Sequence, residues 1–179
     1  MRIISGIARG RRLKSLPGDD VRPTTDKVKE AVFSAIQFDI EGRRFLDLFA
    51  GSGQMGLEAL SRGAESAVFV DSSAESVKIC KGNVISTGFS EQSKIIRNDA
   101  LTFLSLTNEV FDFAFLDPPY GGGLLEKALT KVCEKMSDYG TVICEHPPEV
   151  VLPEKVGDFS VYKRYRYGKI NVTTYKKDN

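Results

Sequence analysis

Apolar and polar residues alternate along this chain in blocks that predict helices and strands in turn. The first helix is expected to begin at residues 23–26, with one apolar stripe formed by Val28, Ala31, Val32, Ala35 and Ile36. Strands are then predicted at 44–49, 67–71, 93–97, 111–116 and 140–145, and the intervening helices at 54–62, 74–86, from 100 onward and at 123–137. Such alternation is typical of a mostly parallel sheet with helices on both faces.

The two ends of the chain depart from this alternation. Residues 161–167 and 170–176 are strand-like runs joined at Gly168-Lys169, which predicts an antiparallel hairpin closing the sheet. Residues 2–14 predict a short hairpin around Ala8-Arg9-Gly10, with a flexible basic arm as the alternative. We therefore expect a doubly wound α/β fold with a seven-stranded, mostly parallel sheet. The chain is expected to be one compact domain overall, with a basic N-terminal hairpin or arm at 1–22 before the main body at 23–179.

Length and composition narrow the class of protein. A single domain of 179 residues buries roughly two thirds of the surface that its unfolded chain exposes, so no covalent staple is needed. Cys80, Cys133 and Cys144 are far apart within apolar runs, which predicts core residues in a reducing compartment and no metal site. No signal-peptide-like or membrane-spanning apolar stretch is present, so we expect a soluble, cytoplasmic protein.

The charge is unevenly distributed, although its formal sum is only +1. Residues 2–29 carry eight Lys/Arg against three Asp, and residues 161–177 carry six Lys/Arg and no acid, so the rest of the chain is acidic. Two basic ends can form one patch for a polyanion such as nucleic acid, or remain separate solvated faces. The candidate nucleic-acid contacts are Arg2, Arg9, Arg11, Arg12, Lys14, Arg22, Arg164, Arg166 and Lys169.

A glycine turn follows the strand predicted at 44–49. The run Asp47-Leu48-Phe49-Ala50-Gly51-Ser52-Gly53 with Gly56 also fits the dinucleotide fingerprint, which alone is a weak signal. In either case the glycines let the backbone approach a ligand closely, and Asp71, after the next strand, can accept hydrogen bonds from ribose hydroxyls. Asp47 can reach an amino group of the ligand or hold the amides of the turn.

Two further motifs follow later strands and favour S-adenosylmethionine over a nicotinamide cofactor. Asn98-Asp99-Ala100 can accept from an adenine amino group, although Asp99 also suits a helix N-cap. Asp117-Pro118-Pro119-Tyr120 ends the run 111–116 and combines a carboxylate, a restricted backbone and an aromatic ring, which suits a flat group bearing an amine. His146, the one histidine, follows a predicted strand where a base could act, and a satisfied or exposed histidine is the favoured interpretation.

These motifs resemble the class I, Rossmann-like methyltransferases that act on exocyclic amines. The matching segments are Arg2-Ile3-Ile4-Ser5-Gly6, Gly10-Arg11-Arg12-Leu13, Arg22 to Phe33, Asp47 to Gly53 and Gly56 to Gly63. Together they are similar to the bacterial 16S ribosomal RNA guanine-N2 methyltransferase family, RsmD, over nearly the whole chain. Gln54-Met55 departs from the smaller or more apolar residues usual in that family.

The resemblance implies a site, a cofactor and a partner. S-adenosylmethionine is expected to bind Asp47, Phe49, Gly51, Gly53, Asp71, Ser72, Asn98, Asp99 and Ala100, and catalysis to use Asp117, Pro118, Pro119 and Tyr120. The expected partner is 16S rRNA in the small ribosomal subunit or its assembly intermediate. A monomer is the favoured oligomeric state. The alternatives are an amine methyltransferase on adenine or a protein glutamine, and a non-catalytic RNA-binding assembly factor.

Overall fold

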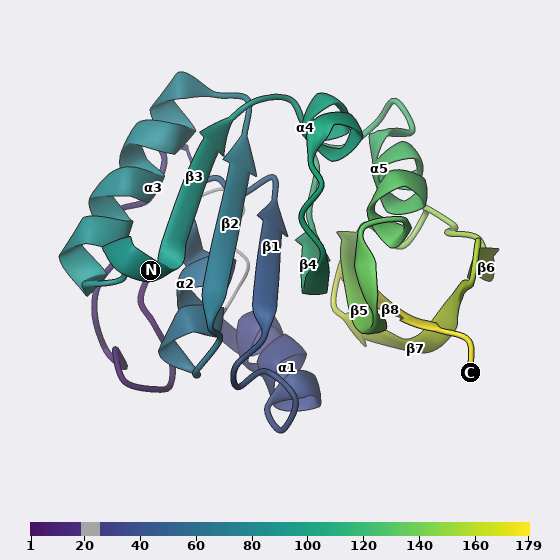
Figure 1. The fold of residues 1–179 in the computed structure, drawn as a ribbon, viewed down its shortest axis with the longest axis horizontal. Coiled ribbons are helices and arrows are strands. Elements are labelled where there is room, and N and C mark those ends of the chain that lie inside the picture. Colours follow the sequence, from purple (N-terminus) through teal and green to yellow (C-terminus); the bar gives the residue numbers. More distant parts are fainter. Residues whose placement is uncertain (19–25) are drawn as a thin grey trace.

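One eight-stranded sheet organises the molecule, and a computed structural model describes residues 1–18 and 26–179. Its strand order is β3-β2-β1-β4-β5-β8-β7-β6 (Figure 1). The strands are β1 (Arg44–Leu48), β2 (Ser66–Asp71), β3 (Ser93–Arg97), β4 (Phe111–Leu116), β5 (Met136–His146), β6 (Lys155–Val156), β7 (Phe159–Tyr167) and β8 (Ile170–Lys177). The helices are α1 (Asp26–Ile36), α2 (Gln54–Ser61), α3 (Ala74–Thr87), α4 (Ala100–Leu106) and α5 (Leu124–Cys133), with a short 3-10 turn, η2 (Ser90–Gln92).

The topology confirms the predicted Rossmann-like class and corrects it in two places. Strands β1 to β5 are parallel, and β8 and β7 close the sheet as the expected antiparallel hairpin. The described sheet has eight strands and not seven, because the two-residue β6 pairs with the start of β7. Helix α5 ends at Cys133 and β5 begins at Met136, so the prediction of helix up to residue 137 is wrong.

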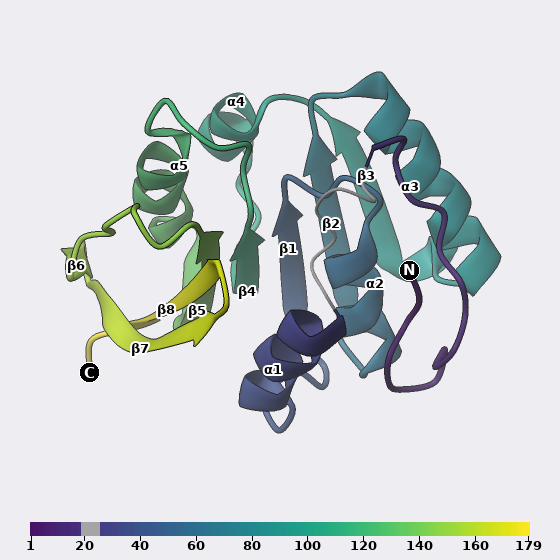
Figure 2. The same ribbon diagram turned by 180° about the vertical axis from the view of Figure 1, so that it is seen from behind.

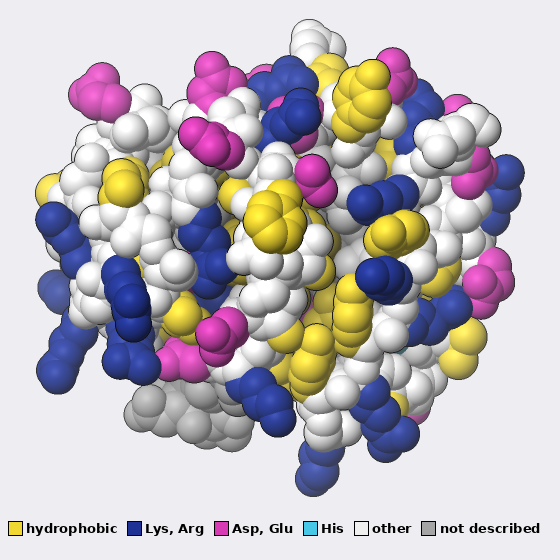
Figure 3. All heavy atoms as spheres, turned by 90° about the horizontal axis from the view of Figure 1, so that it is seen from below, with side chains coloured by type: hydrophobic (Ala, Val, Ile, Leu, Met, Phe, Trp, Pro, Cys, Tyr) yellow, Lys and Arg dark blue, Asp and Glu magenta, His cyan; other side chains and the backbone are white. Residues whose placement is uncertain are grey.

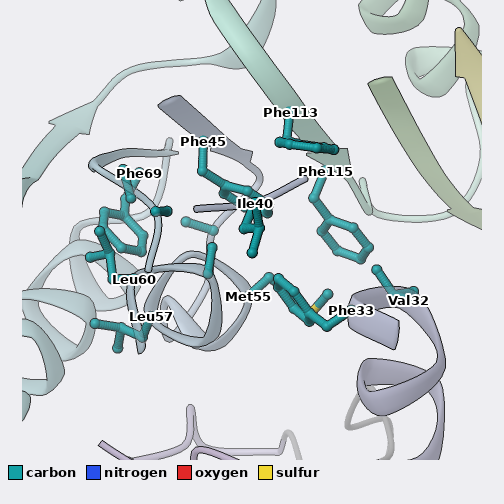
Figure 4. Packing of buried hydrophobic residues seen from close by; sticks show 14 of the residues in the cluster. Val32, Phe33, Ile40, Phe45, Met55, Leu57, Leu60, Phe69, Phe113 and Phe115 are labelled. Carbon is teal, nitrogen blue, oxygen red and sulfur yellow. The ribbon is translucent and has the colours of Figure 1, made fainter. Parts of the chain in front are cut away.

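The helices divide into two layers, one on each face of the sheet. Helices α1, α2 and α3 cover one face, where the buried core contains Phe33, Phe45, Met55, Phe69 and Phe115 (Figures 2 and 4). Helices α4 and α5 cover the other face around a second buried cluster. Strand β4 is buried along its whole length, as its unbroken apolar run requires between two helical layers. Because β3, β2, β1 and β4 are parallel neighbours, their carboxyl ends lie side by side at one edge of the sheet.

The N-terminal segment is docked on the body and is not a free arm. Arg2 and Arg12 form an antiparallel bridge, and Ile3 is fully buried. The carboxylate of Glu58 accepts from the backbone amides of Ile4 and Ser5 at 2.9 and 3.0 Å. Residues 2–14 thus fold back on themselves, as the predicted hairpin does, but their pairing is the isolated Arg2–Arg12 bridge and they form no regular strand.

A buried ion pair supports this docking. Lys29 and Glu58 have fully buried side chains, and Lys29 Nζ lies 3.9 Å from Glu58 Oε2 and donates to the carbonyl of Arg2 at 2.7 Å. Removing one partner from such a pair typically costs 3–5 kcal/mol, because the other charge is left uncompensated. The segment is thus held by polar contacts as well as by Ile3.

The cysteines and the helices bear on the predictions of buried thiols and of no membrane span. Cys80, Cys133 and Cys144 are free thiols and buried, so the prediction that they are core residues is confirmed. Burial raises the pKa of all three thiols, which keeps them protonated and unreactive. Within residues 1–18 and 26–179, none of the helices has the length and apolar character needed to span a bilayer.

Candidate active site

A cavity of about 530 Å³ opens where β1, β2, β3 and β4 end, the usual ligand position in an open α/β sheet. Ten of the thirteen residues predicted to bind cofactor or to act in catalysis line it: Phe49, Gly51, Asp71, Ser72, Asn98, Asp99, Ala100, Asp117, Pro118 and Pro119. The other three, Asp47, Gly53 and Tyr120, are not among its lining residues. The structure thus brings four separate sequence motifs to one hollow.

The glycine turn after β1 is shaped by backbone geometry and by packing. Phe49, at φ 91°, is the only non-glycine residue with a positive φ in the described part of the chain, and Gly51 and Gly53 have φ of 55° and 83°. A Cβ placed on Gly53 would lie 2.7 Å from Cys80 Sγ, and one on Gly56 would lie 2.3 Å from Phe69 Cε1. Gly53 therefore lets the turn approach α3, and Gly56 lets α2 pack closely against β2.

Asp71 ties the end of β2 to the glycine turn. Its Oδ2 accepts from the amide of Gly51 at 2.8 Å, and its Oδ1 accepts from the amide of Ser73 at 2.9 Å. Each carboxylate oxygen can accept a second hydrogen bond, so these contacts orient the group and leave it able to accept from a ligand hydroxyl. Asp71 is half-buried in the cavity wall, where such a ligand would reach it.

Asp47 lies beneath the turn, and its side chain holds the backbone. It is 2 % exposed, and its Oδ2 accepts from the amide of Gly56 at 2.9 Å. Burial, reinforced by the negative charges of Asp71 and Asp117, raises the pKa of Asp47 to about 8 despite the hydrogen bond from Gly56. Asp47 was predicted either to reach an amino group of the ligand or to hold the amides of the turn, and its hydrogen bond from Gly56 supports the second role.

Asn98 and Asp99 form the rim of the cavity at the end of β3. Asp99 is the N-cap of α4, where its Oδ1 accepts from the amides of Leu101 and Thr102 at 3.0 and 3.1 Å. The hydroxyl of Thr102 donates to the other oxygen of Asp99, and this bond lowers the pKa of that carboxyl. Asp99 is therefore an ionised acceptor at the rim, and its capping role is compatible with ligand binding.

The tetrad after β4 stands at the opposite wall. Asp117, Pro118 and Pro119 line the cavity, whereas the side chain of Tyr120 is 52 % exposed beyond it. Three glycines follow, Gly121, Gly122 and Gly123, all with positive φ and with nothing within 4 Å of a Cβ built on them. The tetrad is thus fixed to a buried strand on one side and to an open glycine loop on the other.

Several residues that line the cavity were not predicted from the sequence. They are Leu16, Ala50, Ser52, Gln54, Val70, Ser73, Ser76 and Leu124. Ala50, Ser52 and Gln54 could have been found, because they are neighbours of the glycine turn. Leu16 could not, because only the docking of the N-terminal segment brings it to the cavity.

His146 has a structural environment, in agreement with its sequence interpretation. It is buried at the end of β5, with Nε2 2.8 Å from Thr173 Oγ1 and Nδ1 3.0 Å from the carbonyl oxygen of Pro147. Burial lowers its pKa, so the ring is neutral at physiological pH. Both ring nitrogens are engaged, and His146 is not among the residues lining the cavity.

The candidate RNA contacts fall into two separate groups. Arg9, Arg11 and their neighbours belong to the segment packed on α2 and α3, where Arg11 Nη1 donates to the carbonyl of Ser86 at 2.9 Å. Arg164, Arg166 and Lys169 belong to the β7–β8 hairpin at the other end of the sheet (Figures 1 and 2). On the face drawn in Figure 3, Lys and Arg side chains are scattered among acidic and apolar side chains. The described members of the two groups thus belong to segments at different ends of the sheet, and Arg22 lies outside the described residues.

The comparisons with known proteins agree with this geometry. The family described as Conserved hypothetical protein 95 matches residues 1–176. YlbH of Bacillus subtilis is 42% identical over 182 residues, covering 99% of both chains. The Ribosomal RNA small subunit methyltransferase D of Escherichia coli K12 is 31% identical over 99% of this chain and 90% of its own. The solved structure of yhhF from Escherichia coli superimposes with a TM-score of 0.90 at 28% identity, covering 100% of this chain and 98% of that one.

The fold and the arrangement of motifs define a class I, Rossmann-like methyltransferase. With a match over residues 1–176 and relatives above 30% identity across nearly its full length, the chain belongs to the RsmD family.

Proposed function

We propose that this protein transfers a methyl group from S-adenosylmethionine to the exocyclic N2 amine of a guanine in 16S rRNA, within the small ribosomal subunit or its assembly intermediate. The observation that carries the proposal is the shared cavity, in which Asp117 and Pro118 face the same hollow as the glycine turn and Asp71. The name of the Escherichia coli relative, Ribosomal RNA small subunit methyltransferase D, supports the substrate class. Such a substrate places the reaction in the cytoplasm.

The residues present fit the proposed cofactor. The cavity of about 530 Å³ is within the range of small-molecule sites. Asp71 and Ser72 would accept from ribose hydroxyls, Asn98, Asp99 and Ala100 would border the adenine, and the turn at Phe49 and Gly51 would follow the methionine part. Gly53 and Asp47 lie beneath the turn and would contribute by holding its backbone in shape.

The tetrad would hold the amine. The nitrogen lone pair of guanine N2 is delocalised into the ring, so the amine needs to be oriented before it can attack. Asp117 would accept one N–H and the carbonyl oxygen of Pro118 the other, and Pro119 would fix the backbone that presents them. Tyr120, exposed beside the cavity, would stack on the base, a contact worth roughly 1–3 kcal/mol.

The main contribution of these residues would be orientation. S-adenosylmethionine supplies an electrophilic methyl group on a sulfonium and needs no metal ion. Alignment of reacting groups is worth at most roughly 7–11 kcal/mol, and Asp117 would accept the amine proton as transfer proceeds. Because a base-paired N2 cannot enter such a cavity, the target would be an unpaired or flipped-out nucleotide. The two basic groups would contact phosphates, which would make binding salt-dependent.

The proposal is tested by methyl transfer from labelled S-adenosylmethionine to small subunits purified from cells that lack this protein. The labelled RNA is digested, and the modified nucleoside is identified by mass spectrometry, with Asp117→Ala protein as the matched control. N2-methylguanosine with wild type and none with Asp117→Ala is the expected result. Methylated adenine, label in protein, or no transfer by a wild-type protein that binds the cofactor would each contradict it.

A further inference from the structure

One wall of the cavity belongs to the N-terminal segment, which is far from the other motifs in sequence. Leu16 lines the cavity, and its Cδ1 lies 3.6 Å from the position of a Cβ built on Gly51. Leu16 therefore packs over the glycine turn. The shape of this wall depends on how the segment before Leu16 is held.

The side chain of Asn83 on α3 joins this segment to the glycine turn. It is 1 % exposed. Its Nδ2 donates to the carbonyls of Lys14 and Ser52, both at 2.9 Å, and its Oδ1 accepts from the amide of Lys14 at 2.8 Å. One amide thus connects three parts of the chain: α3, the residue two positions before Leu16, and the centre of the glycine turn.

The chemistry of this contact is specific to an amide. Both donors and the acceptor of Asn83 are used, and no other side chain of this size presents two donors and an acceptor in that arrangement. Each of the three backbone groups would lose a buried partner if the amide were removed. Asn83 therefore determines whether the Lys14–Leu16 backbone and the glycine turn keep a fixed separation.

We propose that Asn83 is a positioning residue of the cofactor site, which acts by clamping the N-terminal segment to the glycine turn so that Leu16 closes one wall. The inference rests on the proposed use of S-adenosylmethionine. If the clamp is released, only a fraction of molecules has a complete wall, and the apparent affinity for the ligand falls by that fraction. By reciprocity, ligand binding strengthens the docking of the segment by the same factor.

The test compares two variants that loosen opposite ends of the N-terminal segment. Asn83→Leu removes the clamp at the cavity. Ser61→Ala removes the hydroxyl that donates to the carbonyl of Ser5 at 2.6 Å and accepts from the amide of Ala8 at 3.0 Å, away from the cavity. Calorimetric titration with S-adenosylhomocysteine is expected to give an about five- to tenfold weaker affinity for Asn83→Leu and an unchanged affinity for Ser61→Ala. Equal weakening in both, or in neither, overturns the inference.

Two further measurements remain decisive if Asn83→Leu does not fold. Leu16→Ala shortens the wall itself and is expected to weaken S-adenosylhomocysteine binding as well. In the wild-type protein, hydrogen exchange of the Lys14 amide is expected to slow when the ligand saturates the site. If neither measurement changes although wild type binds the ligand, the inference about Asn83 is wrong and the proposed cofactor is unaffected. If wild type does not bind the ligand at all, the proposed cofactor is wrong, and so is the proposed function.

Discussion

The two glycine-containing loops at the carboxyl edge of the sheet are built in different ways. In the turn after β1, a Cβ on Gly53 or Gly56 would collide with Cys80 or Phe69. The amides of Gly51 and Gly56 donate to the side chains of Asp71 and Asp47, which are half-buried and buried. In the loop after β4, Gly121, Gly122 and Gly123 face open space, and only their positive φ favours glycine.

The difference matches the two ligands proposed for the site. A small cofactor that is the same in every reaction cycle is best bound by a preorganised loop, because the entropy of ordering that loop has already been lost during folding. A nucleotide within a large RNA has to be admitted from outside, which an open loop beside the tetrad permits. If the packed turn binds the proposed cofactor and the open loop positions the proposed substrate, changes in the two loops are expected to affect different measurements.

The largest expected effect is on catalysis. Asp117→Ala removes the carboxylate that would orient the amine and accept its proton, so methyl transfer to small subunits is expected to fall by at least about 100-fold. Single-turnover transfer of labelled methyl groups measures the change. Tyr120→Ala, at a half-exposed ring outside the cavity, is expected to lose less. A turnover for Asp117→Ala equal to that of wild type would remove Asp117 from the mechanism.

The next effect is on stability and concerns the packed turn. Gly56→Ala places a methyl group 2.3 Å from Phe69 Cε1, and overpacking of this kind costs about 1–3 kcal/mol. For a chain of this length that lowers the melting temperature by roughly 3–10 °C, as calorimetry would detect. Gly82→Ala is the matched control, since it lies within α3 with nothing near its Cβ, and it is expected to stabilise by about 0.5–1 kcal/mol. Equal melting temperatures for the two variants would contradict the packing argument.

The third effect is a pH dependence caused by Asp47. Its pKa is about 8 in the folded protein and 3.8 in the absence of burial, so between these values the native state binds a proton that the unfolded state does not. Asp47 therefore makes stability fall as pH rises from about 4 to about 8, by at most about 1.4 kcal/mol per pH unit. Asp47→Asn keeps an acceptor for Gly56 and removes the titration. Urea unfolding at pH 6 and pH 8.5 is expected to show a smaller loss for the variant, and parallel curves would disprove the raised pKa.

The smallest effect is on RNA binding. Arg166→Glu with Lys169→Glu alters the β7–β8 hairpin, whose register places Asn171 beside His146 at the end of β5, near the tetrad. Affinity for small-subunit RNA is expected to fall several-fold, with a shallower salt dependence. Arg9→Glu with Arg11→Glu, in the segment packed on α2 and α3, is expected to weaken binding less. A larger loss for the second pair would place the RNA on the opposite side of the molecule.

The sequence predicted most of the fold because the parallel strands are short apolar runs that each end in a recognisable turn. It failed at residues 134–139, where Ser137 donates to Asp112 at 2.8 Å and the amide of Phe111 donates to the carbonyl of Lys135. These partners belong to another strand, so no local pattern reveals them. The short strand β6 likewise exists only because β7 pairs with it.

The candidate site shows the same division between local and tertiary information. Gly51, Asp71, Asp99 and Asp117 were predicted because each follows a strand whose end could be located in the sequence. Leu16 and Asn83 were missed because their places depend on the return of the N-terminal segment across α2 and α3. Residues that follow strands could be predicted, and residues that support them from other layers could not.

The central claim, that separate loops hold the cofactor and the amine, is tested most directly by titrating S-adenosylhomocysteine into Asp117→Ala protein. Calorimetry is expected to give an affinity within about threefold of wild type, less than 1 kcal/mol, although transfer is abolished. An affinity that falls in parallel with the rate of transfer would contradict the claim, because the tetrad would then be part of the cofactor cradle.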